Sequence, residues 1–184
     1  DFSYDEPVFI ADGSRRRASL AFRCGKGQTV LGFNSLQSNA VNQVENCPLL
    51  TARINRNLPF LRQLAEDICQ IKITQKIKKG KNAPVCVSSG DVFITEADNG
   101  LDVVLEFLPG LNLEMRQLIF EAVLPNPDIV RLSYRGGPDK TPETIMEKSR
   151  PHLQIAGRDV YIPAGTFLQP SKAGEKALIL SLIH

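Results

Sequence analysis

Apolar and polar positions alternate in the first part of the chain, which predicts β-strands. Over residues 16–24 one face of the strand is apolar and is expected in the core. This face carries Ala18, Leu20 and Phe22. Residues 25–27, Gly-Lys-Gly, predict a turn, and residues 28–33 predict the returning strand of a hairpin. Residues 40–45 predict a third short strand.

Apolar residues then recur every three or four positions between residues 54 and 71, which predicts an amphipathic helix. Pro59 lies within this stripe and leaves two arrangements open. Either one helix kinks at Pro59, or a second helix begins there with Pro59 in its first turn. A second stripe over residues 111–123 predicts another helix, which ends before Pro125 and Pro127.

The remaining strands are recognised by their turns. Asp98-Asn99-Gly100 predicts a tight hairpin, because Asn-Gly accepts the positive φ angles that such a turn needs. A last hairpin is expected across Gly157. The strands are expected at residues 85–87, 92–97, 101–108, 129–134, 153–155 and 160–162. Strands, helix, hairpin, helix and strands in this order predict an α+β domain with a mostly antiparallel sheet and two main amphipathic helices.

The tail has a different character. A helix is expected to begin near Pro170 or Ser171, and its apolar side chains need a partner surface. These side chains are Leu178, Ile179, Leu182 and Ile183. We therefore expect residues 1–165 to form one domain and residues 166–184 to be the first element of another, so that the chain is the front portion of something longer.

Charge is unevenly distributed along the chain. The net charge is +2, but residues 1–90 carry 13 basic and 7 acidic side chains, whereas residues 91–184 carry 9 and 13. Such asymmetry favours a polyanionic partner such as a nucleic acid. The alternative is that the basic run KIKKGK at residues 76–81 is simply a solvated loop. No apolar run approaches about 18 residues, so no membrane span is expected.

Most catalytic site types lack their residues. His152 and His184 are the only histidines, which leaves almost nothing for a zinc site or a Ser-His-Asp triad. The sequence has no G-x-G-x-x-G and no Walker motif. The four cysteines are widely spaced without a C-x-x-C, so free thiols in a reducing compartment are expected. The residues alone therefore indicate binding rather than a complete catalytic site.

Binding residues are easier to identify. Arginines on a sheet face beside an aromatic ring suit phosphates and bases, although Phe22 itself is expected in the core. Gln169 follows an aromatic residue and precedes a proline at a helix start. Two roles are open for it: capping the helix, or reaching a ligand over the adjoining sheet.

Four stretches carry a family resemblance: SRRRASLAF at residues 14–22, LGFNSLQSNAVNQVENCPLL at 31–50, ADNGLDVVL at 97–105 and YIPAGTFLQPSKAGEKAL at 161–178. In their order and approximate spacing they resemble the TrmA/RumA-type RNA 5-methyluridine methyltransferases. The resemblance covers most of the chain.

The resemblance implies that residues 1–165 are the family's central α+β domain and that residues 166–184 begin its class I methyltransferase domain. Members transfer a methyl group from S-adenosylmethionine to C5 of a uridine in rRNA or tRNA, after a cysteine thiolate has attacked C6 of a flipped-out base. The nucleophile, the base and the cofactor loop lie downstream in the family. The resemblance therefore implies no catalytic residue in this chain and no activity of the chain alone.

Individual positions carry over as well. Gln169 matches the family glutamine that contacts S-adenosylmethionine, and Phe167 matches the aromatic residue that lines the pocket of the target base. Cys47 matches the fourth ligand of a [4Fe–4S] cluster whose other three ligands lie upstream. Its alternative role is that of a small buried residue before a helix. Three arginines are expected on the RNA backbone: Arg15, Arg16 and Arg17.

RNA is the partner that the resemblance implies, in the cytoplasm, with no membrane and no protein partner. The unpaired tail is nevertheless free to pack on a neighbouring copy. The alternative function is a non-catalytic RNA-binding or interaction module.

Overall fold

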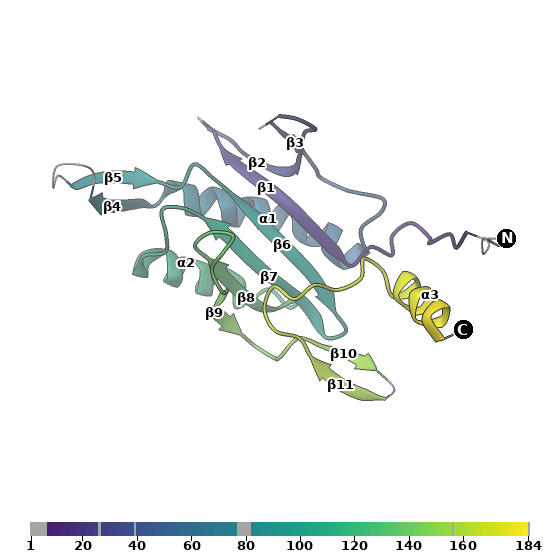
Figure 1. The fold of residues 1–184 in the computed structure, drawn as a ribbon. Helices are drawn as coiled ribbons and strands as arrows, with labels where there is room; N and C mark the ends of the chain where they lie inside the picture. Colours follow the sequence, from purple (N-terminus) through teal and green to yellow (C-terminus); the bar gives the residue numbers. More distant parts are fainter. Residues whose placement is uncertain (1–6, 26, 39, 77–81, 156, 184) are drawn as a thin grey trace.

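The computed structural model describes residues 7–25, 27–38, 40–76, 82–155 and 157–183. It confirms the α+β class, with a mostly antiparallel sheet in the order β3-β2-β1-β6-β7-β8-β9 (Figure 1). The strands of this sheet are β1 (Arg17–Cys24), β2 (Thr29–Asn34), β3 (Val41–Gln43), β6 (Ser89–Ala97), β7 (Gly100–Phe107), β8 (Ile129–Arg135) and β9 (Glu143–Glu147). Two hairpins stand outside it: β4 (Lys72–Lys76) with β5 (Asn82–Cys86), and β10 (His152–Ile155) with β11 (Arg158–Tyr161).

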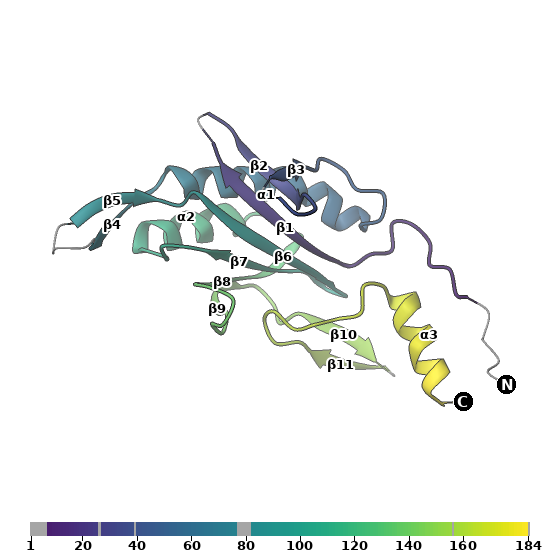
Figure 2. The same ribbon diagram turned by 45° about the horizontal axis from the view of Figure 1, so that its top comes forward.

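The two faces of the large sheet are covered differently. Neighbouring strands are antiparallel except β7 and β8, which run parallel, and α2 (Leu113–Val123) connects these two. α1 (Ala52–Gln70) and α2 lie on one face. The β10/β11 hairpin and the segment that leads to α3 (Lys172–Ile183) lie on the opposite side (Figure 2). We call these the helix-covered face and the open face.

The main core lies between the helix-covered face and the apolar stripe of α1. The predicted strand face of β1 is buried there, and Phe22 is only 1% exposed, so its placement in the core is confirmed. Leu20 lies opposite Val92 in the register of β1 and β6, and both are fully buried. The buried residues of α1 are Ile54, Asn57, Leu58, Leu61, Leu64, Ala65 and Ile68.

α1 runs as one helix through Pro59, which decides between the two arrangements left open by the sequence. Pro59 deprives the Asn55 carbonyl of its usual amide partner, and packing of the apolar stripe offsets this cost. The start of the helix is well held. Thr51 caps it by accepting a hydrogen bond from the Ile54 amide at 3.4 Å, and the Asn55 side chain accepts from the Cys47 amide at 2.9 Å.

The expectation of four free thiols was wrong. Cys24 and Cys69 form a disulfide that joins the end of β1 to the end of α1. Packing of the helix on the sheet brings their Cα atoms to 6.3 Å although they are 45 residues apart, a proximity that spacing in the sequence does not reveal. Among the described residues, Cys47 and Cys86 are free.

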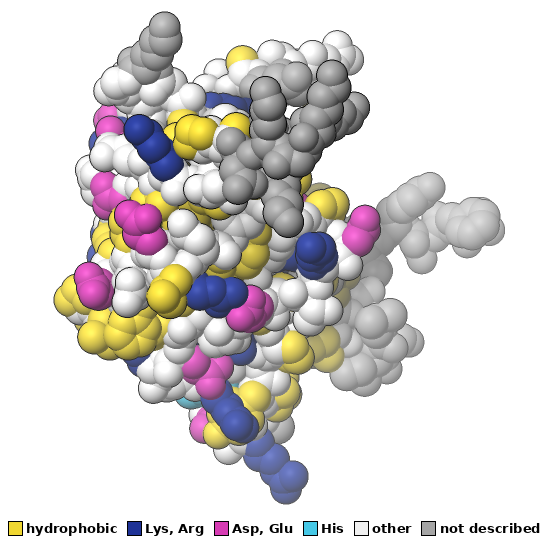
Figure 3. All heavy atoms as spheres, turned by 90° about the vertical axis from the view of Figure 1, so that its left-hand side faces the viewer, with side chains coloured by type: hydrophobic (Ala, Val, Ile, Leu, Met, Phe, Trp, Pro, Cys, Tyr) yellow, Lys and Arg dark blue, Asp and Glu magenta, His cyan; other side chains and the backbone are white. Residues whose placement is uncertain are grey.

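The second basic run is only partly described. Lys72 and Lys76 belong to β4, whereas Lys78, Lys79 and Lys81 lie outside the described residues. On the end of the molecule shown in Figure 3, positive and negative side chains of the described residues are intermixed. No helix within the described ranges is long and apolar enough to cross a bilayer.

The tail helix begins where the sequence predicts. The Ser171 hydroxyl accepts a hydrogen bond from the Gly174 amide at 3.0 Å and so caps α3. Three consecutive apolar residues of α3, Leu178, Ile179 and Leu180, are each about half exposed. Polar contacts hold the first turns instead: Arg16 pairs with Glu175 at 2.7 Å, and Lys172 pairs with Asp98.

Candidate functional site

Residues 162–170 run along the open face of the sheet and carry both predicted site residues, Phe167 and Gln169. We call this stretch the connector. Arg131 in β8 donates to the Ile162 carbonyl at 3.0 Å, which fixes the beginning of the connector. Its end meets the start of β1, because the Arg16 amide donates to the Pro170 carbonyl at 2.7 Å. The connector therefore lies across the sheet rather than projecting from it (Figure 1).

Phe167 is exposed and has a cation against one ring face. Its exposed fraction is 67%, and the Arg17 guanidinium carbon lies 4.5 Å from the ring centroid. Such a pair is attracted through the quadrupole of the ring. An exposed aromatic ring held in this way can stack a planar group such as a nucleobase.

Gln169 lines a mainly apolar groove of about 570 Å³ between residues 8–15 and α3. Its backbone carbonyl accepts from Arg16 Nε at 3.0 Å, while its side-chain amide hydrogen-bonds no other described residue. Because Ser171 caps α3, the capping role left open for Gln169 is excluded. Its amide is thus available to a ligand in the groove.

The three arginines at the start of the sheet differ in their surroundings. Arg16 is 3% exposed and bound by Glu175 and the connector, so it offers no surface to a phosphate. Arg15 is exposed, and Arg17 is partly exposed. Burial lowers the pKa of Arg17, and the charges of Arg15 and Arg16 lower it further, although a guanidinium stays protonated at neutral pH. The predicted RNA contacts therefore concern Arg15 and Arg17 only.

Two further residues of the open face were missed by sequence reasoning. The Arg135 guanidinium lies 4.8 Å from the centroid of the Phe93 ring and pairs with Glu106 at 2.5 Å. Phe93 and Arg135 line a hollow of about 180 Å³ together with Arg17. The signal was available, because Phe93 alternates with the core residues of β6 and must therefore point to the other face.

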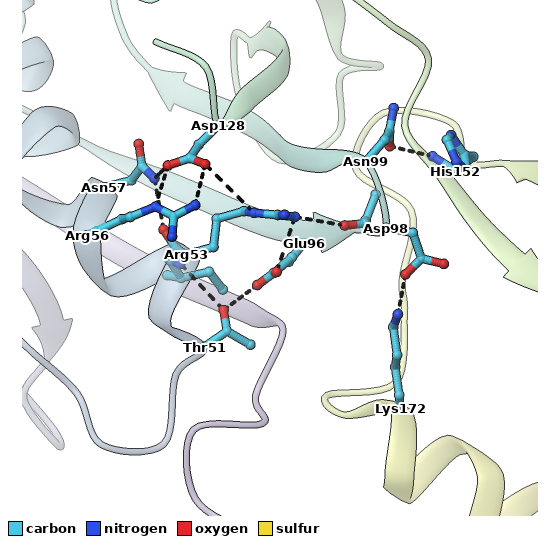
Figure 4. Close-up of polar contacts among 12 residues, drawn as sticks. Thr51, Arg53, Arg56, Asn57, Glu96, Asp98, Asn99, Asp128, His152 and Lys172 are labelled. Atoms are coloured by element: carbon cyan, nitrogen blue, oxygen red, sulfur yellow. Dashed lines mark hydrogen bonds and ion pairs between the residues drawn. The ribbon is translucent and has the colours of Figure 1, made fainter.

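A polar network joins α1 to the ends of β6 and the loop before β8 (Figure 4). Asp128 accepts from Arg56 Nε at 2.6 Å and from the Asn57 amide at 2.9 Å, and Arg53 reaches Glu96 at 3.3 Å. The Thr51 hydroxyl donates to Glu96 as well. Because every one of these groups has a partner, we assign the network to holding the fold together.

Acid should weaken this network. The hydrogen bond from Arg56, followed by that from Asn57, lowers the pKa of Asp128 from 3.8 to about 2 despite partial burial. A lowered folded-state pKa stabilises the fold fully above the unfolded value near 4, and the contribution is lost as the pH falls toward 2. We expect urea midpoints measured from pH 5 to pH 2 to fall less steeply in Asp128→Asn. Equal slopes for the two proteins would contradict this assignment.

Cys47 is partly buried just before α1. A [4Fe–4S] cluster usually takes four thiolates. Among the described residues no group of three or more His, Cys, Asp or Glu side chains could hold a metal ion, so Cys47 has no companion ligands there. The residues present do not make up a cluster site, and the iron–sulfur assignment stays a prediction.

Comparisons with known proteins now give this geometry a context. No family model matches the chain. An RNA methyltransferase of Agrobacterium fabrum is 27% identical over 181 residues, which is 98% of this chain and 38% of the relative. The 23S rRNA (uracil(1939)-C(5))-methyltransferase RlmD of Marinomonas posidonica is 32% identical over 108 residues, 59% of this chain and 21% of the relative.

The fold agrees with a solved structure. The tRNA (uracil-54, C5)-methyltransferase of Pyrococcus abyssi, in complex with S-adenosyl-L-homocysteine, superposes with a TM-score of 0.58 at 17% identity. The match covers 94% of this chain and 41% of that one. The chain thus spans about 38% of the length of the first curated relatives. The chain is homologous to the part of these RNA methyltransferases that it matches. The resemblance to RNA methyltransferases that its sequence indicated is therefore confirmed.

Proposed function

We propose that this chain is a segment of an RNA uracil-5 methyltransferase. The enzyme would transfer a methyl group from S-adenosylmethionine to a uridine of rRNA or tRNA. The observation that carries the proposal is the connector, which presents an exposed aromatic ring at Phe167 and, two residues later, a Gln169 amide that hydrogen-bonds no other described residue. The names of the homologous RNA methyltransferases support the reaction class. We further propose a cytoplasmic location, where these RNA substrates are found.

Within that reaction, we assign this chain binding and orientation. The half-buried amide of Gln169 would hydrogen-bond S-adenosylmethionine in the groove, and the ring of Phe167 would line the pocket of the target base. When bound, S-adenosylmethionine supplies an activated methyl group. No cysteine of this chain matches the family nucleophile, so we assign no bond-forming step to it. Residues 1–165 would position the RNA, and residues 166–184 would belong to the catalytic domain.

RNA would approach the open face of the sheet. Arg15 offers an exposed guanidinium group suited to phosphate oxygens, and Phe167 offers a stacking surface. A non-catalytic RNA-binding module would use the same face without needing the groove beside Gln169. Methyl transfer and cofactor binding therefore separate the two functions.

The direct experiment incubates the complete product of the gene that encodes this chain with unmodified rRNA and tRNA transcripts and labelled S-adenosylmethionine. We expect label at C5 of one uridine, located by nuclease digestion and mass spectrometry. RNA binding with no methyl transfer and no cofactor binding would overturn the proposal in favour of the non-catalytic module.

Gln169→Ala in the same protein is expected to weaken binding of S-adenosylhomocysteine about 10-fold or more, because a hydrogen bond to a charged ligand contributes about 1.5–3 kcal/mol. Isothermal titration calorimetry measures the dissociation constant. Gln117→Ala is the matched control, since Gln117 is exposed on α2, away from the groove. Equal affinities for both variants and the unmodified protein would remove Gln169 from the cofactor site.

A further inference from the structure

Two consecutive arginines hold three consecutive carbonyls of the connector. Arg17 Nη1 donates to the Leu168 carbonyl at 2.9 Å, Arg16 Nε donates to that of Gln169 at 3.0 Å, and the Arg16 amide donates to that of Pro170 at 2.7 Å. These are side-chain and backbone contacts across more than 150 residues of sequence. The start of β1 therefore sets the path of the connector residue by residue.

Arg16 occupies a position that is costly for a charge. It is 3% exposed, and a buried guanidinium needs both a counter-charge and hydrogen-bond acceptors. Glu175 in α3 supplies the charge at 2.7 Å, and the Gln169 carbonyl supplies an acceptor. The guanidinium thus bridges the connector and the first turns of α3, which fixes the backbone of Gln169 from both sides.

Arg17 acts on the neighbouring residues in two ways. Its guanidinium holds the Leu168 carbonyl and also lies against the ring of Phe167, 4.5 Å from the centroid. A planar guanidinium can donate along its edge while its flat face stacks on a ring, a geometry that a tetrahedral ammonium group does not offer. Backbone and ring of the Phe-Leu pair are thus oriented by one side chain.

Neither site side chain has another described polar anchor. Phe167 is 67% exposed, and the amide of Gln169 is unengaged. Leu168 between them is 8% exposed and packs in a small cluster with Ala97, Leu153 and Ile162. Packing therefore fixes Leu168, while Arg17 contacts the ring of Phe167 and Arg16 contacts the backbone carbonyl of Gln169.

We propose that Arg16 and Arg17 are positioning residues, which hold Phe167 and Gln169 in the orientation that the bound base and cofactor require. The proposal rests on the proposed function for what the two residues bind, and it gives Arg16 and Arg17 a role other than neutralising RNA phosphates. Arg15 does not take part in these contacts with the connector, because among the described residues its Nε donates only to the Arg17 carbonyl.

The orientation can be tested without RNA or cofactor. The chain contains no tryptophan, so Phe167→Trp introduces a single tryptophan, which serves as a fluorescent reporter at the site. In this background Arg17→Ala is expected to lower the fluorescence anisotropy and raise acrylamide quenching about twofold, because the cation against the ring is lost. Arg17→Lys keeps the charge and is expected to retain part of the anisotropy and part of the protection from quenching that Arg17→Ala loses. Arg15→Ala is the matched control and should leave the reporter unchanged.

Arg16 is tested through its counter-charge, because removing a buried arginine could unfold the chain. Glu175→Gln keeps the shape of the side chain and leaves Arg16 in place. A lower anisotropy of the reporter supports the positioning role if the near-ultraviolet circular dichroism of the tyrosines is unchanged, because the fold is then intact. A reporter unaffected by both Arg17→Ala and Glu175→Gln overturns it, whatever the methyltransferase assay shows.

RNA binding by the complete gene product separates positioning from phosphate contact. The logarithm of RNA affinity falls as the logarithm of salt concentration rises, and loss of one phosphate contact makes this fall shallower by about one unit of slope. We expect that decrease in Arg15→Ala. Arg17→Ala should keep the slope and lose affinity for S-adenosylhomocysteine about 10-fold, the loss expected when the connector is released at Leu168 and the hydrogen bond from the Gln169 amide to the ligand is lost. A reduced slope with unchanged S-adenosylhomocysteine affinity in Arg17→Ala would show a phosphate contact and overturn the proposal for Arg17.

Discussion

Asp102→Asn is expected to lower the free energy of unfolding by about 3–5 kcal/mol, the cost of leaving one member of a buried ion pair uncompensated. Asp102 and Arg131 are 3% and 6% exposed, and two parallel hydrogen bonds of 2.8 Å join them. Asparagine has nearly the same shape, so the loss reflects charge and hydrogen bonding rather than a cavity. Glu147 at 3.6 Å is 34% exposed and compensates Arg131 only weakly.

Urea denaturation at neutral pH measures this effect, and an exposed pair on the same chain provides the control. Arg116 and Glu143 make a similar two-bonded contact at 2.9 Å, but their side chains are 37% and 58% exposed. Glu143→Gln is expected to cost less than about 1 kcal/mol, because solvent screens exposed charges. Equal losses in the two variants would show that burial does not determine the strength of the Asp102–Arg131 pair.

The pair also bears on the site, since Arg131 donates to the Ile162 carbonyl at the beginning of the connector. In Asp102→Asn the Phe167→Trp reporter should therefore become more mobile at temperatures at which the sheet is still folded. The sheet would thus support the site from β8 at one end of the connector and from β1 at the other.

Leu61→Ala is expected to lower the free energy of unfolding by about 2–5 kcal/mol, through lost burial and the cavity left behind. Leu61 is 1% exposed in the middle of α1 and belongs to the main core. The matched control is Leu113→Ala at the start of α2, where the side chain is 71% exposed. The same atoms are deleted in both, and alanine favours a helix slightly in both, so their difference isolates burial.

Chemical denaturation of the two variants gives the comparison directly. Leu113→Ala should stay within about 0.5 kcal/mol of the unmodified chain, as surface substitutions usually do. A loss below about 1 kcal/mol for Leu61→Ala would mean that α1 is not packed on the sheet as the structure has it.

Local patterns predicted much of the fold. The alternation in β1 and the three-to-four spacing in α1 identified both the elements and their buried faces, because each face must be apolar along its length. The order in which the strands pair in the sheet was harder to predict from the sequence. β9 escaped prediction because its apolar content is low and it pairs at the sheet edge, and the parallel neighbours β7 and β8 are set by a crossover rather than by a turn signal.

The candidate site likewise has features that the sequence could predict and features that it could not. Phe167 and Gln169 were predicted as site residues from a short sequence motif, and their roles and ligands remain predictions. The roles of Arg15, Arg16 and Arg17 could not be separated, because three adjacent arginines look alike until burial distinguishes them. The disulfide partner of Cys24 was likewise hidden, 45 residues away on a helix.

The sequence by itself thus determined the class of fold, the strands and helices with strong periodicity and the family resemblance, and it predicted Phe167 and Gln169 as site residues. Only the tertiary structure decided which arginine is buried against Glu175, that Ser171 rather than Gln169 caps α3, and that the connector lies across the open face. The physical reason is range. Periodicity and capping act over a few residues, whereas the ion pairs and carbonyl contacts that orient Phe167 and Gln169 join residues more than 150 positions apart.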